Sequence, residues 1–186
     1  MVRARPRVAI PIAFFTLIVG GAVPSDQTDP KLDALFAALA VADTSSEAAV
    51  IEERIWSLWL ETDRPEVEES LGRGILAMNL GNHAAALLAF DAVVAAAPRL
   101  AEGWNRRATL HFLMGNFEAS VRDIDATLAL EPRHFGALSG LAMIREAQER
   151  PFEALEALEK VQRIHPRMPH LAERVARLTA QLGDPI

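Results

Sequence analysis

The chain has 186 residues, of which 51% are hydrophobic and only 6% aromatic, so it is long enough for one domain with a continuous core and favours helices over strands. Its formal net charge of -6 disfavours nucleic acid as a partner, because an acidic surface repels the phosphate backbone. The absence of cysteine excludes disulfides, thiolate metal sites and thiol nucleophiles.

The N-terminus has the layout of a secretory signal peptide. Three arginines precede an apolar run from 8 to 23, whose far end holds small residues (Arg3, Arg5 and Arg7; Gly20, Gly21 and Ala22). We expect cleavage after Ala22, so that residues 1–22 are removed, residues 23–29 form a linker and the protein reaches the periplasm. The alternative is an uncleaved segment that anchors the protein in the inner membrane, although the apolar run is shorter than the roughly 20 residues that span a bilayer.

Two helices are expected next. Asp29 and Pro30 form an N-cap and a first-turn proline, which open a helix through about Ala42. Residues 44–47 have the spacing of a capping box ahead of a second helix. We therefore expect residues 30–65 to form a degenerate helical hairpin that caps the N-terminal end of the following helices.

A period of 34 residues organises the centre of the chain. Three prolines, each followed by arginine, are spaced by 34 (Pro98, Pro132 and Pro166). The Gly-Asn dipeptide at 81–82 recurs at 115–116, with the same spacing. Glycine can adopt the left-handed conformation that ends a helix, and asparagine is a good N-cap for the next one. Each unit is therefore predicted to be two antiparallel helices, with the proline blocking continuation of the second.

In this period and its pattern of large and small residues, the chain resembles the tetratricopeptide-repeat (TPR) family. The unit 101–134 matches most clearly, at Trp104, Ala108, Gly115, Phe117 and Pro132. The units 67–100 and 135–168 match at further positions (Gly74, Gly81, Ala86, Phe90 and Pro98; Leu138, Leu141, Ala142, Ala154, Leu158 and Pro166). They depart from the pattern at Ser70, which replaces the tryptophan, and at Glu149, which replaces the turn glycine. The resemblance implies an all-α fold, a right-handed superhelix of antiparallel helix pairs.

The core and the C-terminal end follow from the same pattern. Small residues at Gly74, Ala108 and Ala142 let the two helices of each unit cross closely, and Trp104 is expected to be buried between the helices of the middle unit. Residues 169–186 are predicted to form a capping helix and a short tail. Its apolar residues have helical spacing (Leu171, Val175, Leu178 and Leu182).

The sequence contains no pattern typical of a catalytic, cofactor or metal site. The histidines do not form a ligand pair on one helix face, and the prolines between His165 and His170 favour a solvated turn there. A phosphate-binding glycine loop and a nucleophile elbow are both missing. We therefore expect a binding protein that is not an enzyme and has no small-molecule substrate.

The first helices of TPR units line a concave groove, and helical spacing selects the residues that would face it. We predict a partner-binding groove with an apolar surface and a polar centre, formed by Leu71, Ile75, Met78, Asn105, Arg106, Thr109, Phe112, Ser139 and Met143. The alternative is that the flanking helices curl inward and bury this surface. A clamp for a C-terminal carboxylate is not expected, because the corresponding positions are Leu71, Ile75, Arg106, Gly136 and Gly140.

The expected function is that of an exported adaptor for a protein or peptide in cell-envelope assembly or maintenance. The export signal and repeat layout resemble those of small envelope TPR proteins of proteobacteria. The alternative is a structural or self-associating scaffold that uses its convex face or its caps. An exposed patch of Ile55, Trp56 and Trp59 on the N-terminal hairpin would favour that alternative.

Overall fold

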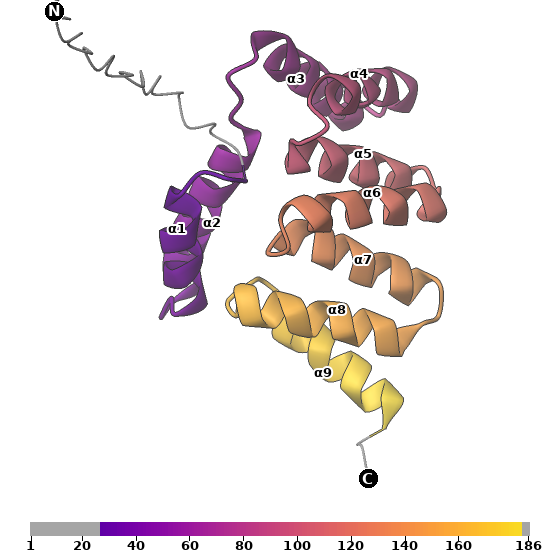
Figure 1. Cartoon of the computed structure of the whole chain (residues 1–186). Coiled ribbons are helices and arrows are strands. Elements are labelled where there is room, and N and C mark those ends of the chain that lie inside the picture. Colours follow the sequence, from indigo (N-terminus) through magenta and orange to yellow (C-terminus); the bar gives the residue numbers. More distant parts are fainter. Residues whose placement is uncertain (1–26, 184–186) are drawn as a thin grey trace, which may run out of the picture.

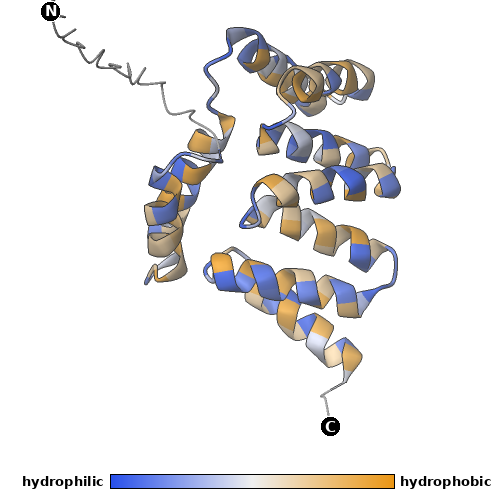
Figure 2. Ribbon diagram, viewed as in Figure 1, coloured by the Kyte–Doolittle hydropathy of each residue, from blue (hydrophilic) through white to orange (hydrophobic). Residues whose placement is uncertain are grey.

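The computed structural model describes residues 27–183, and every regular element in that range is an α-helix (Figure 1). Consecutive helices pack as antiparallel pairs that stack into an elongated array, so the predicted all-α superhelix is confirmed. The helices are α1 (Lys31–Ala40), α2 (Ser45–Leu60), α3 (Pro65–Asn79), α4 (His83–Ala96), α5 (Ala101–Leu113), α6 (Phe117–Leu130), α7 (Phe135–Ala147), α8 (Pro151–Ile164) and α9 (Leu171–Leu182). Figure 2 shows apolar and polar residues alternating along most of them, as amphipathic helices in a stack require.

The turns within the helix pairs have the predicted backbone geometry. Gly81 and Gly115 have φ values of 71° and 73°, in the left-handed region where glycine avoids the clash of a Cβ atom. The side chain of Asn82 caps α4 by accepting a hydrogen bond from the amide of Ala85 at 3.1 Å. Asn116 occupies the same position before α6, but its side chain makes no capping hydrogen bond, so that part of the prediction is wrong.

The helix crossings depend on small residues. A Cβ atom at Gly74 would collide with the ring of Phe90, which fills the space between α3 and α4. Ala108 and Ala142 are buried at the equivalent positions of the next two pairs. The predicted role of small residues at these positions is therefore confirmed.

Trp104 is only partly buried, which corrects the expectation that it lies between the helices of the middle unit. Its indole N–H donates to the carbonyl of Pro98 at 2.9 Å, and the guanidinium carbon of Arg107 lies 5.0 Å from the ring centroid. These partners hold the indole at the rim of α5 beside the preceding loop. Leu110, which is fully buried, fills the interface with the first unit instead.

The hairpin α1–α2 does not cap the stack beyond α3, contrary to the sequence-based expectation. It lies along one side of the array, where α2 packs against α5 and α1 against α8 (Figure 1). Phe36 and Trp59 from the hairpin pack on Phe135 of α7, with ring centroids 6.5 and 5.1 Å away. These aromatic side chains join the core of the third repeat and hold the hairpin at the side of the array.

Each loop that closes a repeat makes a hydrogen bond to this N-terminal region. The side-chain amide of Gln27 contacts the loop 98–101, accepting a hydrogen bond from the amide of Ala101 at 3.1 Å. One repeat later, Arg133 donates to Asp33 at 2.7 Å, and one repeat later again Arg167 donates to the carbonyl of Ala42 at 3.3 Å. The period of the array thus fixes the direction of α1 across it.

The C-terminal helix covers the third repeat, as predicted. Leu171 and Leu178 of α9 are buried against α8, whereas Leu182 is 41% exposed. The helix begins at Leu171 rather than Pro169, because His170 adopts a left-handed conformation with φ 59°. In the described part of the chain, no helix combines the length and apolar character needed to cross a bilayer.

Candidate protein-binding groove

A cavity of about 260 Å³ lies on the concave face, between α5, α6 and α7. Five of the residues predicted for the groove line it, namely Asn105, Thr109, Phe112, Ser139 and Met143. Their positions follow from the helical repeat, because residues three and four apart on α5 face the equivalent residues of α7. The structure therefore brings these side chains to one site.

Apolar atoms form most of the cavity wall. The Phe112 ring packs against that of Phe117 with centroids 5.7 Å apart, and Ile124 lies at the base. Met143 is 44% exposed and stands at the opening, where its flexible thioether can adapt to a bound side chain. Thr109 and Ser139 contribute hydroxyl groups to the wall, and the Thr109 hydroxyl donates to the carbonyl of Asn105 at 3.0 Å.

The three groove residues predicted on α3 lie elsewhere. Leu71 is buried in the first repeat, and Ile75 and Met78 are half-buried against the same cluster. None of them lines the cavity between α5 and α7. These three side chains instead pack in the cluster between α3, α4 and α5.

The polar centre predicted for the groove belongs to a buried network. Asn105 donates to Glu102 at 2.9 Å, and Arg106 forms an ion pair with the same carboxylate at 2.5 Å. Glu102 has no exposed surface, and His134 lies 3.0 Å from it. Arg106 and the amide group of Asn105 are therefore committed within the protein, although Asn105 still forms part of the cavity wall.

His134 has a defined role at the centre of this network. Its Nδ1 accepts a hydrogen bond from the amide of Ala137 at 3.1 Å, which caps α7 and leaves Nε2 to donate to Glu102. Its ring stacks on Trp59 with centroids 4.0 Å apart. Burial raises the pKa of Glu102, but the hydrogen bond from His134 and the charge of Arg106 outweigh it, so that the pKa lies below its ordinary value.

The hairpin covers one end of the concave face. The ring of Trp56 lies against Gly136, where an added Cβ atom would approach it to 2.6 Å, and 5.7 Å from the guanidinium carbon of Arg106. The covered end is that of the helix N-termini, while the end lined by Phe112 and Met143 stays open. The hairpin therefore buries one end of the predicted groove and leaves the other end open.

Sequence reasoning missed some of the cavity wall, notably Ala108, Leu113, Ser120, Gly136 and Gly140. The hydroxyl of Ser120 donates to the carbonyl of Ala108 at 2.7 Å, which ties α6 to α5 behind the cavity. Small residues at 136 and 140 leave room beside α7, and their spacing of four was the signal available in the sequence.

The histidines of the described chain are structural where they are buried. His165 was expected in a solvated turn, but it is 1% exposed and lies 3.1 Å from Glu52 of α2. The hairpin brings that carboxylate onto the loop and thereby covers the imidazole. Within residues 27–183, histidine, aspartate and glutamate side chains do not cluster in a group that could hold a metal ion.

Comparison with known proteins identifies the family. A family model described as Tetratricopeptide repeat matches residues 71–120 and 105–169. A TPR repeat-containing protein of Rhizobium etli is 35% identical over 159 residues, which cover 86% of this chain and 78% of that relative. The chain belongs to the TPR family. Its three 34-residue units are the source of the helix pairs α3–α4, α5–α6 and α7–α8.

Solved TPR structures show the same fold. The first TPR domain of Spaghetti (RPAP3) bound to an HSP90 peptide has a TM-score of 0.61, with 19% identity, and the alignment covers 64% of this chain and 95% of that domain. The TPR2B domain of yeast Sti1 in its complex with pHsp70 has a TM-score of 0.59, with 18% identity, covering 63% of this chain and 99% of that domain. At this identity the likeness establishes the TPR fold.

Proposed function

We propose that this TPR protein is a non-catalytic adaptor that binds an extended or helical segment of a partner protein in the cavity between α5 and α7. The observation that carries the proposal is the meeting of Phe112 and Met143 at the open end of an apolar cavity on the concave face. A concave apolar surface with a few polar groups at its edge is how proteins commonly divide affinity from orientation.

The size of the cavity favours a protein partner over a small molecule. Its volume of about 260 Å³ lies below the range of about 300–1,000 Å³ typical of small-molecule sites. It fits an apolar side chain that projects from a peptide, with the rest of that peptide lying across Met143 and Thr109. One structural neighbour is bound to an HSP90 peptide and the other is in a complex with pHsp70, which agrees with protein binding as a use of this fold.

The groove should bind an apolar side chain of the partner rather than its charged C-terminal carboxylate. Positions that would clamp a carboxylate are occupied by Leu71, Ile75, Gly136 and Gly140, which have no basic group. Arg106 is paired with the buried Glu102 and lies beneath Trp56. Binding should therefore depend little on salt, because screening acts mainly on interactions between charges.

A displayed peptide library tests the groove directly. Peptides selected on the purified protein should share an apolar anchor, and Phe112→Ala combined with Met143→Ala should weaken their binding at least about tenfold. Val50→Ala, at an exposed position of α2, is the matched control and should leave binding unchanged. Unchanged binding by a double variant that is still folded by circular dichroism would disprove the groove.

We also propose that the protein is exported and acts in the cell envelope. The segment that carries this proposal, residues 1–22, lies outside the described residues. Mass spectrometry of the protein from cells should find a mature N-terminus at Val23, and a reporter active only outside the cytoplasm should function when fused after residue 30. Retention of Met1 in a membrane-bound form would instead support the inner-membrane anchor.

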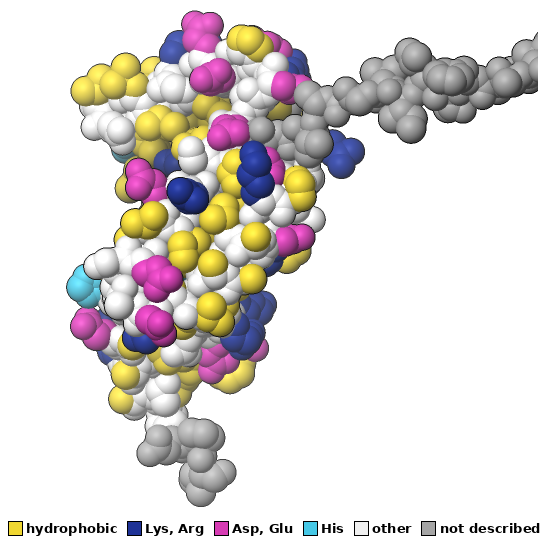
Figure 3. All heavy atoms as spheres, turned by 90° about the vertical axis from the view of Figure 1, so that its left-hand side faces the viewer, with side chains coloured by type: hydrophobic (Ala, Val, Ile, Leu, Met, Phe, Trp, Pro, Cys, Tyr) yellow, Lys and Arg dark blue, Asp and Glu magenta, His cyan; other side chains and the backbone are white. Residues whose placement is uncertain are grey.

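The exposed hairpin patch that would favour the alternative scaffold role is not present in the structure. Ile55 and Trp59 are buried, at 0% and 1% exposure, and Trp56 is half-buried against α7. The side of the molecule formed by α1 and α2 shows apolar side chains interspersed with charged ones (Figure 3). A self-association surface must therefore lie elsewhere.

A further inference from the structure

The outer face of the first repeat, formed by α3 and α4, leaves large apolar side chains uncovered. Leu76, Leu80 and Leu88 are 61%, 74% and 75% exposed, and with Ala85 and Ala92 they line a hollow between the two helices. We call this surface the α3/α4 face. The hairpin leaves it uncovered, because α1 and α2 pack at the side of the array against α5, α7 and α8.

The positions equivalent to Leu76 in the next repeats show that helices normally cover its part of this surface. Leu110 and Ile144 follow Leu76 at intervals of 34, and both are fully buried. They are covered because α4 packs on α5 and α6 packs on α7. Leu76 presents the same contact surface, but the preceding helix pair, α1–α2, packs against α5 and α8 and does not cover it.

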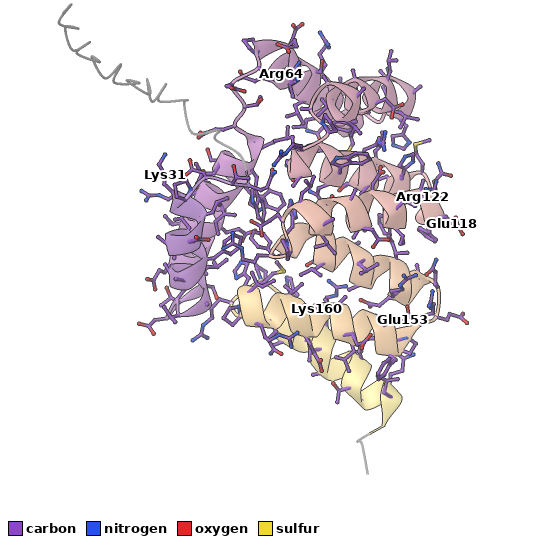
Figure 4. The ribbon with its side chains drawn as sticks, viewed as in Figure 1. Lys31, Arg64, Glu118, Arg122, Glu153 and Lys160 are labelled. Carbon is purple, nitrogen blue, oxygen red and sulfur yellow. The ribbon has the colours of Figure 1, made fainter. Side chains whose placement is uncertain are left out.

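The composition of α4 supports the same reading. Leu88 stands where the second repeat has Arg122, and Ala92 stands where the third has Lys160. Both of these charged residues, labelled in Figure 4, are exposed. Apart from His83 at its first position, α4 contains one acid or base, Asp91, which is held in an ion pair within the chain. Terminal repeats normally carry a polar outer face, and a helix that is apolar on most sides is normally buried (Figure 2).

The charges at the two ends of the described array indicate what covers the α3/α4 face. At the opposite end, α9 exposes Glu173, Arg177 and Gln181. A head-to-tail contact would therefore place charged groups on the apolar α3/α4 face. Among the described residues lining the hollow, Arg73 alone is charged, and it is paired with Glu69 on its own helix. Two copies of this face therefore meet without unpaired like charges.

We propose that two copies of the chain associate through their α3/α4 faces in a closed, two-fold symmetric dimer. Such an interface is isologous, so each leucine of one copy contacts the equivalent region of the other. Ala85 and Ala92 lie on the same side of α4 and let the two helices approach closely. The contact shares no residue with the cavity between α5 and α7, so each protomer keeps its groove open.

Sedimentation of the purified full-length protein over a range of concentrations tests the proposal. The wild type should be a dimer, and Leu88→Arg combined with Leu76→Gln should raise its dissociation constant at least about tenfold. Both leucines are largely exposed in the protomer, so circular dichroism should show an intact fold. Val50→Arg, which changes an exposed valine of α2, is the matched control and should leave the dimer unchanged.

Single-cysteine variants locate the interface, since the natural chain has no cysteine. Ala92→Cys should form a disulfide-linked dimer on oxidation, whereas Val50→Cys should not. A monomeric wild type would overturn the proposal. If the Leu88→Cys thiol of that monomer were protected from a maleimide, another part of the chain, such as residues 1–26, would be the occupant. A dimer that resists the double variant and cross-links at Val50→Cys would also overturn it, by placing the contact on the hairpin.

Discussion

Glu102 is a carboxylate without exposed surface, and its partners come from its own helix and from a loop. Arg106 and Asn105 lie on its own helix, and His134 belongs to the loop before α7. The imidazole also caps α7 and stacks on Trp59 of the hairpin. One side chain therefore connects α5, α7 and α2, and its loss should affect all three.

His134→Ala should lower the free energy of unfolding by about 3 kcal/mol, because it removes a partner of a buried carboxylate together with a helix cap. His134→Asn should lose less, since its amide oxygen can still cap α7. Chemical denaturation measures both losses. His170→Asn is the control, because His170 is exposed and asparagine tolerates its left-handed backbone. A loss from His134→Ala as small as that of the control would contradict the central role of the imidazole.

The stability should fall in acid. Hydrogen bonds and opposite charges lower the pKa of Glu102, against the effect of its burial, and they lower the pKa of Glu146 in the same way, through Arg174 and Arg177. A carboxyl group with a lower pKa in the folded state stabilises the fold above its unfolded pKa of about 4.3, and this contribution is lost as the pH falls.

Urea denaturation between pH 6 and pH 3 should therefore show a midpoint that decreases below about pH 4.5. Glu102→Gln should flatten the curve, since the amide does not titrate, although the variant is less stable at neutral pH. Equal slopes for the wild type and the variant would show that Glu102 does not contribute to the acid sensitivity.

At the scale of the helical elements, the turns show how far local sequence determines structure. The Gly-Asn dipeptides predicted two left-handed turns, at Gly81 and Gly115, and both are present. The third turn places Glu149 at the same point with φ 56°, so a residue with a Cβ atom adopts the conformation of the missing glycine. The array imposes this geometry because α7 and α8 pack in the same way as the pairs before them.

Glu149→Gly should raise the free energy of unfolding by about 0.5–1 kcal/mol, since it relieves a left-handed conformation at a modest cost in chain entropy. Gly115→Ala should lower it by a similar amount for the converse reason. Thermal denaturation of the two variants measures this pair of opposite shifts. A destabilised Glu149→Gly variant would mean that the glutamate side chain has a favourable role at the turn.

At the scale of the whole molecule, the sequence predicted the repeats but not the place of the hairpin. The period of 34 and the small residues at Gly74, Ala108 and Ala142 are local signals, and they determine how the two helices of each pair cross. The position of α1 and α2 depends on contacts between Trp59 and His134 or Phe135, which are distant in sequence and follow no period.

The groove was predictable to the same extent. Helical spacing correctly brought Phe112 and Met143 to one cavity, because both lie on first helices of adjacent repeats. It could not show that Asn105 and Arg106 are held by Glu102, since a buried glutamate is expected only when its partners are known. Helical spacing also could not show that Leu71 lies outside the cavity, because this depends on how Leu71 packs in the core between α3, α4 and α5.

The two tryptophans provide a test of how the hairpin stabilises the array. Trp59 is 1% exposed and packs on α7, so Trp59→Ala should cost about 3–5 kcal/mol, whereas Trp104 is only partly buried, so Trp104→Ala should cost about 1–2 kcal/mol. Trp59→Phe should lose less stability than Trp59→Ala, since the aromatic stack is kept and the indole N–H has no hydrogen-bond partner among the described residues.

Urea denaturation followed by circular dichroism measures these losses and also tests the cooperativity of unfolding. Trp59→Ala should still unfold in one transition, because the hairpin and the third repeat share a single core. An early transition that releases only α1 and α2 would instead show that the repeats are stable without the hairpin and that it is an accessory to the array.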